Sequence, residues 1–157
     1  MNLQETLTQD NIYQVSATTG EEVIFELLTH LAEKQLIKSH DDAFADIIQR
    51  ENNQCSSAGR GLAYPHGEVD GLKSFIAIMG ISKKGIHYNS PDRQPCHIFM
   101  LTISPSKNPK KHKRFLNLYR SMIQDSNIRE NIIESKTSQE IVSIIHFWEN
   151  NQMDMDI

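Results

Sequence analysis

The amino-acid sequence predicts an α/β fold, a three-layer sandwich whose central β-sheet is covered by helices on both faces. Three observations favour this fold. Residues 21–51 carry apolar side chains at helical spacing, and residues 109–148 do so again later in the chain. Between these two stretches, residues 73–82 and 96–104 are apolar on both faces, as strands are when helices cover both sides of their sheet. At 157 residues the chain has the length of one domain.

The first part of the chain predicts a short strand, two amphipathic helices and a polar loop, in that order. They cover residues 12–15, 21–35, 41–51 and 52–60. A capping box begins the first helix, because a threonine and a glutamate three residues later can each accept a hydrogen bond from the other's backbone N–H. The candidate pairs are Thr18 with Glu21 and Thr19 with Glu22.

The second part of the chain predicts the core of the sheet and then three helices. A small strand at residues 86–88 separates the two long apolar strands. Asn108 and Pro109 predict the start of the next helix, because asparagine is a good N-cap and proline suits the first helical position. The three helices cover residues 109–123, 126–134 and 137–148. We therefore expect a single domain over residues 1–150 and a frayed tail over residues 151–157.

Composition and charge argue against several classes of protein. The net charge of −4 disfavours general nucleic-acid binding. The apolar runs are far shorter than the roughly 20 residues that span a bilayer, which disfavours direct membrane insertion. The N-terminus has neither a basic nor an apolar segment and predicts no secretory signal. Cys55 and Cys96 form no disulfide or metal-ligand pattern, so we expect a cytoplasmic protein without a metal or cofactor.

The stretch GLAYPHGEVDGL, residues 61–72, places a histidine between a proline and a glycine. Pro65 stiffens the approach to His66, and Gly67 has no side chain to keep a partner group away. The short apolar run before the histidine places it at a strand end, where α/β proteins often carry their chemistry. A neutral imidazole is a nucleophile that can carry a group covalently, whereas a histidine in a turn is more often simply solvated.

The residues around His66 resemble a known family. The pattern is the pair Arg50-Glu51 followed by SSAGRGLAYPHG, residues 56–67. It resembles the enzyme IIA domain of the fructose/mannitol/nitrogen class (type 2) of the bacterial phosphoenolpyruvate-dependent sugar phosphotransferase system. The motif of that family is an Arg-Glu pair, a small loop, and then Gly-apolar-Ala-apolar-Pro-His-Gly. The resemblance extends over nearly the whole chain and implies a mixed sheet between helices.

The resemblance implies a phosphoryl carrier, a phosphotransferase without a cofactor. His66 matches the histidine that accepts a phosphoryl group from phosphorylated HPr and passes it to a cysteine or histidine of an enzyme IIB domain. Arg50 matches the arginine beside the phosphoryl site, and His112 matches a second histidine that holds the phosphoryl oxygens. Phosphoryl transfer has a loose transition state, so a protein mainly positions groups and stabilises spread charge. The planar fork of an arginine suits phosphate oxygens, and the first turn of a helix offers free N–H groups.

The sequence departs from the family pattern at three positions. Arg60 stands where the family usually has asparagine, and Ser57 stands where it has glycine. Together with Gly61, they are our candidates for a loop that contacts the phosphoryl group. Glu68 stands where the family often has a basic residue, and its carboxylate, with that of Asp70, would disfavour a phosphoryl dianion on His66.

A basic run surrounds His112. It consists of Lys107, Lys110, Lys111, Lys113 and Arg114. One interpretation is a solvated surface that contributes little. The other is a docking rim that attracts an acidic face of a partner protein and raises the association rate. No aromatic residues alternate with these charges, which disfavours nucleic-acid binding here.

Two functions from different classes remain open at this point. In the first, the chain carries phosphoryl groups during sugar uptake, and its partners are phospho-HPr and the enzyme IIB component of a sugar permease. In the second, it is a regulatory module of the nitrogen type, whose phosphorylation state controls binding to a target protein. A hydrolase that uses His66 and His112 is disfavoured, because the sequence offers it neither a further nucleophile nor a metal set. The sugar is not readable, since an enzyme IIA domain does not touch it.

Overall fold

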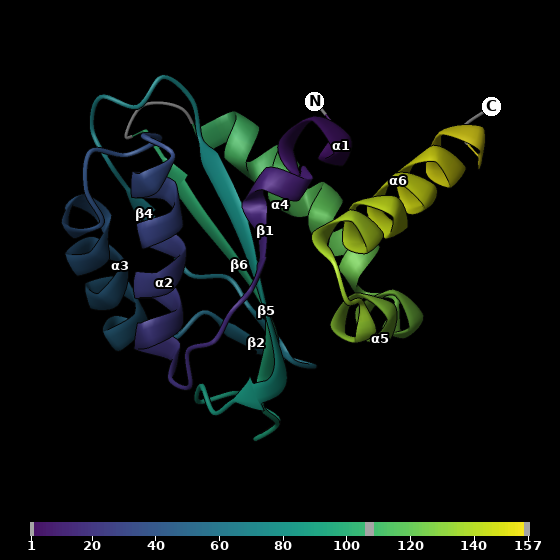
Figure 1. Cartoon of the computed structure of the whole chain (residues 1–157), viewed down its shortest axis with the longest axis horizontal. Coiled ribbons are helices and arrows are strands. Elements are labelled where there is room, and N and C mark those ends of the chain that lie inside the picture. Colours follow the sequence, from purple (N-terminus) through teal and green to yellow (C-terminus); the bar gives the residue numbers. More distant parts are fainter. Residues whose placement is uncertain (1, 106–108, 156–157) are drawn as a thin grey trace.

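A computed structural model describes residues 2–105 and 109–155 and shows a six-stranded mixed sheet between two layers of helices (Figure 1). The strands are β1 (Ile12–Gln14), β2 (Ser57–Gly59), β3 (Leu62–Ala63), β4 (His66–Glu68), β5 (Ile76–Ile86) and β6 (Cys96–Ser104). Their order is β1-β5-β6-β3-β2, and β4 pairs with β6 beyond the end of β3. The β5–β6 pair is antiparallel, whereas β1, β3 and β4 each run parallel to their long neighbour. The predicted three-layer α/β sandwich is therefore confirmed.

Helices cover both faces of this sheet. They are α1 (Leu3–Thr6), α2 (Gly20–Glu33), α3 (Asp41–Asn53), α4 (Pro109–Ile123), α5 (Ser126–Glu134) and α6 (Ser138–Met155), with a short 3-10 helix at Gln9–Asn11. In Figure 1, α2 and α3 lie on one side of the strands, and α1, α4, α5 and α6 lie on the other. No helix in the described part of the chain is long and apolar enough to cross a membrane.

Each face of the sheet has its own hydrophobic core. Because neighbouring side chains of a strand point to opposite faces, Ile78 and Phe99 pack with α2 and α3, whereas Met79 and Met100 pack with the helices of the other layer. All four side chains are buried. The strands β5 and β6 are apolar on both faces because helices cover both faces of the sheet, as the sequence suggested.

The strand β6 positions the motif around His66. Ala63 of β3 pairs with Phe99, and after two further residues His66 of β4 pairs with Thr102 of the same long strand. The carbonyl of Pro65 bridges the two short strands by accepting a hydrogen bond from the Thr102 N–H at 3.1 Å. The histidine therefore begins a strand that is held in register on both sides of the proline.

Two predicted helix starts meet different outcomes. The side chain of Thr19 accepts a hydrogen bond from the Glu22 N–H at 3.2 Å, and Glu22 in turn accepts one from the Thr18 N–H, so Thr19 is the N-cap of α2. The first helix after the long strands, α4, begins at Pro109 as predicted. Asn108, its predicted N-cap, lies outside the described residues.

Several predicted boundaries are wrong in the middle of the chain. Residues 73–82 and 86–88 do not form two strands: one strand, β5, runs from Ile76 to Ile86 with an irregular register opposite β6. Gly85 has a φ of +81°, which only a glycine adopts without strain, and this allows the irregular strand to continue where a turn was predicted. The predicted loop over residues 52–60 contains β2 and the end of α3.

The two ends of the chain pack together, which the sequence did not predict. The last helix, α6, continues past Trp148 to Met155, so residues 151–155 of the predicted frayed tail are helical. Glu149 gives the reason, because its buried carboxylate accepts hydrogen bonds from the N–H groups of Leu3 and Gln4 at 2.6 and 3.0 Å. These are the first free N–H groups of α1, so α1 and α6 fix each other. Residues 156–157 lie outside the described part.

Candidate functional site

A hollow of about 670 Å³ brings four of the predicted site residues together: Arg50, Arg60, His66 and His112. Its walls are the end of α3, the segment from β2 to β4, and one face of α4. The basic side chains that line it are Arg50, Arg60, His66, His112 and Arg120. None of the described residues that line it is acidic. The hollow is therefore suited to an anionic group.

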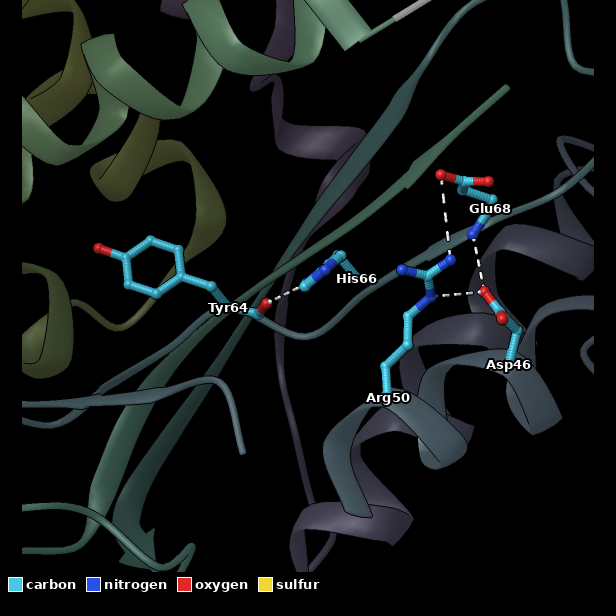
Figure 2. A network of polar contacts seen from close by, with 5 residues as sticks. All are labelled: Asp46, Arg50, Tyr64, His66 and Glu68. Atoms are coloured by element: carbon cyan, nitrogen blue, oxygen red, sulfur yellow. Dashed lines mark hydrogen bonds and ion pairs between the residues drawn. The ribbon is translucent and has the colours of Figure 1, made fainter. Parts of the chain in front are cut away.

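His66 is exposed at the first position of β4. Its ring nitrogen Nδ1 lies 3.2 Å from the backbone carbonyl oxygen of Tyr64 (Figure 2). A carbonyl oxygen only accepts hydrogen bonds, so Nδ1 carries the proton and donates it. In the neutral ring the lone pair then belongs to Nε2, which is the nitrogen of this ring that can act as a nucleophile.

Gly67 lets β4 approach α3. A Cβ atom at this position would lie 2.7 Å from Cγ1 of Ile47, closer than real contacts allow, and 3.0 Å from Oδ2 of Asp46, which is a tight contact. The sequence suggested that Gly67 leaves room for a partner molecule. In the structure the room is filled by α3, and the glycine fixes the distance between the histidine strand and the helix that carries Arg50.

Arg50 is held between two carboxylates (Figure 2). Its Nε donates to Oδ2 of Asp46 at 3.0 Å, and its terminal nitrogen lies 3.9 Å from a carboxylate oxygen of Glu68. The same Oδ2 of Asp46 accepts the backbone N–H of Glu68 at 2.9 Å. Burial alone would raise the pKa of Asp46, but the Glu68 N–H and the Arg50 guanidinium outweigh burial and lower it. The ionised Asp46 thus ties α3 to β4 and orients the guanidinium.

The acidic residues after His66 do not line the hollow. Glu68 turns toward Arg50, and Asp70 lies in the turn after β4, beside a separate hollow near α2. The carboxylate of Glu68 therefore acts beside a guanidinium. The sequence suggested that the Glu68 carboxylate would repel a phosphoryl group on His66. The guanidinium beside this carboxylate weakens that repulsion.

His112 is the fourth residue of α4 and is half-buried. Its Nε2 lies 2.7 Å from the hydroxyl oxygen of Thr102, the residue that pairs with His66 in the sheet. Burial lowers the pKa of His112, and the positive charges of His66 and Arg120 lower it further. The imidazole is therefore held neutral, and the buried hydroxyl fixes its orientation.

The three loop candidates have different positions. Arg60 lines the hollow, whereas Ser57 and Gly61 are not among the lining residues. The hydroxyl of Ser57 points to that of Ser90, with 2.7 Å between the oxygens. The carbonyl of Gly61 accepts the N–H of His97 at 2.8 Å and so belongs to the junction of β3 with β6.

The described residues of the basic run lie on α4 and do not share one surrounding. Lys110, Lys111, Lys113 and Arg114 are all exposed. None of them lines the hollow around His66, and Lys111 and Arg114 line another hollow beside Phe75 and the start of β5. Lys107 lies outside the described residues. The predicted docking rim therefore stays a prediction.

Among the basic residues that line the hollow, Arg120 is the one that the sequence did not indicate. Its guanidinium carbon lies 4.9 Å from the centre of the Tyr64 ring, a cation–π distance. The signal was present, because Arg120 follows His112 by eight residues, which places both on one face of a helix. An arginine on an exposed helix looks ordinary until the opposite wall of the hollow is known.

Glu51 and Cys55 make contacts within the protein, and of the two only Cys55 lines the hollow. Glu51 accepts hydrogen bonds from the N–H and hydroxyl of Ser56 and from the hydroxyl of Tyr88. Cys55 donates its S–H to the carbonyl of Tyr88 at 3.3 Å. Burial, followed by the charge of Glu51, raises the pKa of the Cys55 thiol despite a hydrogen bond from the Ser57 N–H. The thiol is therefore protonated at neutral pH, as expected for a spectator.

Within the described ranges, no group of three or more histidine, cysteine, aspartate or glutamate residues is arranged to hold a metal ion.

Residues 5–147 match the family model described as "Phosphoenolpyruvate-dependent sugar phosphotransferase system, EIIA 2". The chain belongs to this family. Among curated proteins, this EIIA domain is 28% identical to the fructose-specific EIIABC component of Bacillus subtilis, over 93% of the chain but only 23% of that relative. It is also 28% identical to the nitrogen regulatory protein of Klebsiella oxytoca, over 76% of the chain and 75% of the relative.

Solved structures confirm the EIIA fold. The nitrogen regulatory protein IIA-Ntr from Neisseria meningitidis superposes with a TM-score of 0.82 at 21% identity, covering 91% of this chain and 98% of that one. The enzyme IIA of mannitol from Escherichia coli, in its complex with phosphorylated enzyme IIB, gives a TM-score of 0.76 at 14% identity, covering 90% and 97%. At these identities the similarity establishes the fold alone.

Proposed function

We propose that this EIIA domain is a phosphoryl carrier, in which Nε2 of His66 accepts a phosphoryl group from phospho-HPr and passes it to an enzyme IIB domain. One observation carries the proposal. The Nδ1 of His66 is committed to the Tyr64 carbonyl, so the lone pair of the exposed ring is on Nε2, at a hollow whose charged side chains are all basic.

The transfer needs no net proton. The lone pair of Nε2 attacks the phosphorus atom of phosphohistidine in HPr, and the N–P bond of HPr breaks with its electron pair returning to the HPr imidazole. The second step repeats this exchange, with a cysteine thiolate or a histidine of enzyme IIB as the attacking group. Arg50 and His112 stabilise the charge that spreads over the phosphoryl oxygens in both steps. Because Asp46 and Thr102 already orient them, little reorganisation precedes transfer.

The names of similar proteins support the partners in this proposal. The Bacillus relative is called an EIIABC component, and the chain corresponds to about a quarter of it. A structure similar in fold is an enzyme IIA bound to a phosphorylated enzyme IIB. We assign transfer to the cytoplasm, as the sequence predicted, and the sugar stays unassigned.

Phosphoryl transfer in a purified system tests the proposal. The chain is incubated with phosphoenolpyruvate, enzyme I and HPr, and its intact mass is measured before and after mild acid. We expect a single acid-labile addition of about 80 Da, which the His66→Ala variant lacks. His112→Gln and Arg50→Gln should slow labelling by about tenfold to a hundredfold, since each removes one contact to a charged group. Ser57→Ala is the matched control, because its hydroxyl lies outside the hollow.

The proposal fails if the wild type stays unlabelled while an established enzyme IIA domain is labelled in the same tube. A second function is favoured by the similarity to the nitrogen regulatory protein of Klebsiella oxytoca. In that function phosphorylation of His66 controls binding to a target protein, and the phosphoryl group goes no further. Adding an enzyme IIB protein separates the two functions, since only a transport carrier then loses its label.

A further inference from the structure

The hollow around His66 has two differently built cationic ends. At one end, Arg50 lies between the carboxylates of Asp46 and Glu68. At the other end, Arg120 lies over the ring of Tyr64. In Figure 2 the Tyr64 ring extends away from Arg50, and His66 lies between them. A molecule that reaches from His66 to Arg120 therefore meets two separate groups of positive charge.

The charge at the Tyr64 end is not neutralised by the protein. Within the part of the chain that the structure describes, the ion pairs involve Arg50, His30 and His40, and neither Arg60 nor Arg120 takes part in one. Both line the hollow, and none of the described lining residues is acidic. Two guanidinium groups without a carboxylate, facing one concave surface, are a strong attraction for an anion.

The backbone is arranged to carry Arg60 at this place. Arg60 has a φ of +56°, a left-handed conformation that arginine rarely adopts, between Gly59 and Gly61 at +79° and +78°. The Arg60 N–H donates to Oδ2 of Asp92 at 2.7 Å, which fixes the turn from outside. The turn is therefore held through the backbone, and the guanidinium is left for a ligand. Asparagine, the usual residue of the family here, suits this conformation better but has no charge.

Tyr64 lines the hollow together with Arg60 and Arg120. Burial raises the pKa of Tyr64, and the nearby positive charges of Arg120, Arg60 and Arg129 act against that increase. The hydroxyl stays protonated and can donate a hydrogen bond. Together with Arg60 and Arg120, it forms a set of donors at the end of the hollow opposite Arg50.

The size and remaining walls of the hollow suit a small organic molecule. Its volume of about 670 Å³ lies within the range of small-molecule sites, roughly 300 to 1,000 Å³. Leu62, Leu116 and Ile123 supply apolar wall. A phosphoryl group on a partner's histidine would occupy the His66 end and leave the Tyr64 end to another anion.

We propose that this hollow binds a small organic bisphosphate, with one phosphate on Arg60, Arg120 and the Tyr64 hydroxyl and the other beside His66 and Arg50. A phosphoryl group on His66 and the second phosphate would occupy the same place with the same charge. Bound bisphosphate and phosphorylation of His66 therefore exclude each other. This exclusion rests on the proposed function, whereas the binding itself does not.

Calorimetric titration at low salt tests the binding. The probes are fructose 1,6-bisphosphate, fructose 6-phosphate and inorganic phosphate. We expect the bisphosphate to bind about tenfold more tightly than the monophosphate, because a second phosphate gains charge-assisted hydrogen bonds. Arg60→Asn and Arg120→Gln should each remove most of this advantage. Arg114→Gln is the matched control, an exposed arginine of the same helix that lines a different hollow.

Folding of the variants is checked by circular dichroism melting, and Arg60→Asn is chosen because asparagine tolerates a positive φ. Equal affinity for bisphosphate and monophosphate in the wild type would overturn the proposal. So would absence of binding, or equal losses in Arg60→Asn, Arg120→Gln and Arg114→Gln, which would indicate only general charge attraction.

A second assay keeps the two proposals separate. Fructose 1,6-bisphosphate at ten times its dissociation constant should slow labelling of His66 by phospho-HPr about tenfold in the wild type, and far less in Arg120→Gln. If the wild type binds the bisphosphate as expected but is never labelled, the carrier function is wrong and the ligand site stands. If labelling occurs but the bisphosphate neither binds nor slows it, the carrier function stands and the ligand site is wrong.

Discussion

The two walls of the hollow hold their basic side chains by different means. On the wall formed by α3 and β4, Arg50 is fixed by the carboxylates of Asp46 and Glu68. On the wall formed by α4, His112 is fixed by the hydroxyl of Thr102, and Arg120 lies on an aromatic ring. One wall orients its cation with opposite charge, and the other uses neutral partners.

Because of this difference, one wall holds its basic side chain more rigidly, and the other leaves more of its positive charge uncancelled. A carboxylate holds a guanidinium firmly but cancels part of its field, whereas a hydroxyl or an aromatic ring orients a side chain and leaves its charge for the ligand. The α3–β4 wall therefore contributes to stability and positions Nε2 of His66, while Arg120 on the α4 wall keeps its charge for an incoming anion. Mutations on the two walls should accordingly affect different measurements.

The largest effect is expected from Gly67→Ala, which breaks the α3–β4 wall. The new Cβ would lie 2.7 Å from Cγ1 of the buried Ile47, so either the Ile47 side chain or the backbone of β4 and α3 must shift. We expect the free energy of unfolding, measured with urea, to fall by about 1–3 kcal/mol, as for other overpacked sites. The double variant with Ile47→Ala should be less destabilised than the sum of the single changes, because the shortened side chain makes room. Simple additivity would show that the two residues do not press on each other.

A smaller effect is expected when Asp46→Ala is compared with Arg120→Ala. The aspartate accepts from both Arg50 and the Glu68 N–H, so its loss should lower the free energy of unfolding by about 1–2 kcal/mol, a value limited by its partial exposure. Arg120 is exposed, and its removal should change stability by less than about 0.5 kcal/mol while weakening phosphate binding. Equal stability losses in the two variants would contradict the division between the walls.

The smallest effect is a dependence of stability on pH that comes from His112. Its pKa in the folded protein is lowered below the ordinary value of 6.5, so between the two pKa values the unfolded chain binds more protons. Stability contributed by this histidine is complete above about pH 6.5 and is lost as pH falls from there toward the folded pKa. Urea unfolding at pH 7.5 and 5.5 should therefore show a larger loss for the wild type than for His112→Gln. The lowered pKa of Asp46 acts at more acidic pH, below its ordinary 3.8. An identical loss of stability in the wild type and in His112→Gln would mean that His112 is solvated like an exposed histidine.

Much of the fold was readable because its signals are local. Apolar side chains three and four residues apart predicted α2 and α3, and the two-sided apolar runs predicted β5 and β6. The strands β2 and β4 have only three residues each, too few for a period to appear. β4 forms because it pairs with β6, and β2 forms because it pairs with β3, which is itself paired with β6. These partners belong to other parts of the chain.

The site residues likewise divide into those that the sequence located correctly and those that it did not. The motif located His66 and Arg50, and the resemblance located His112, and all three line one hollow. Ser57, chosen by its place in the same loop, points elsewhere, and the described residues of the basic run before Phe115 lie outside the hollow. Spacing along the chain shows which residues are near in sequence, but the direction of each side chain depends on the wall against which it packs.

By itself, then, the sequence determined the helices, the buried strands, the family and the histidine at its centre, because these follow from neighbours a few residues apart and from a contiguous motif. Only the tertiary structure decided which charges are cancelled. Glu68 stands two residues after His66 but turns to Arg50, and Arg120 joins the site from the far side of the hollow. Electrostatic energy depends on distances of a few ångströms between groups from different elements, and folding alone fixes those distances.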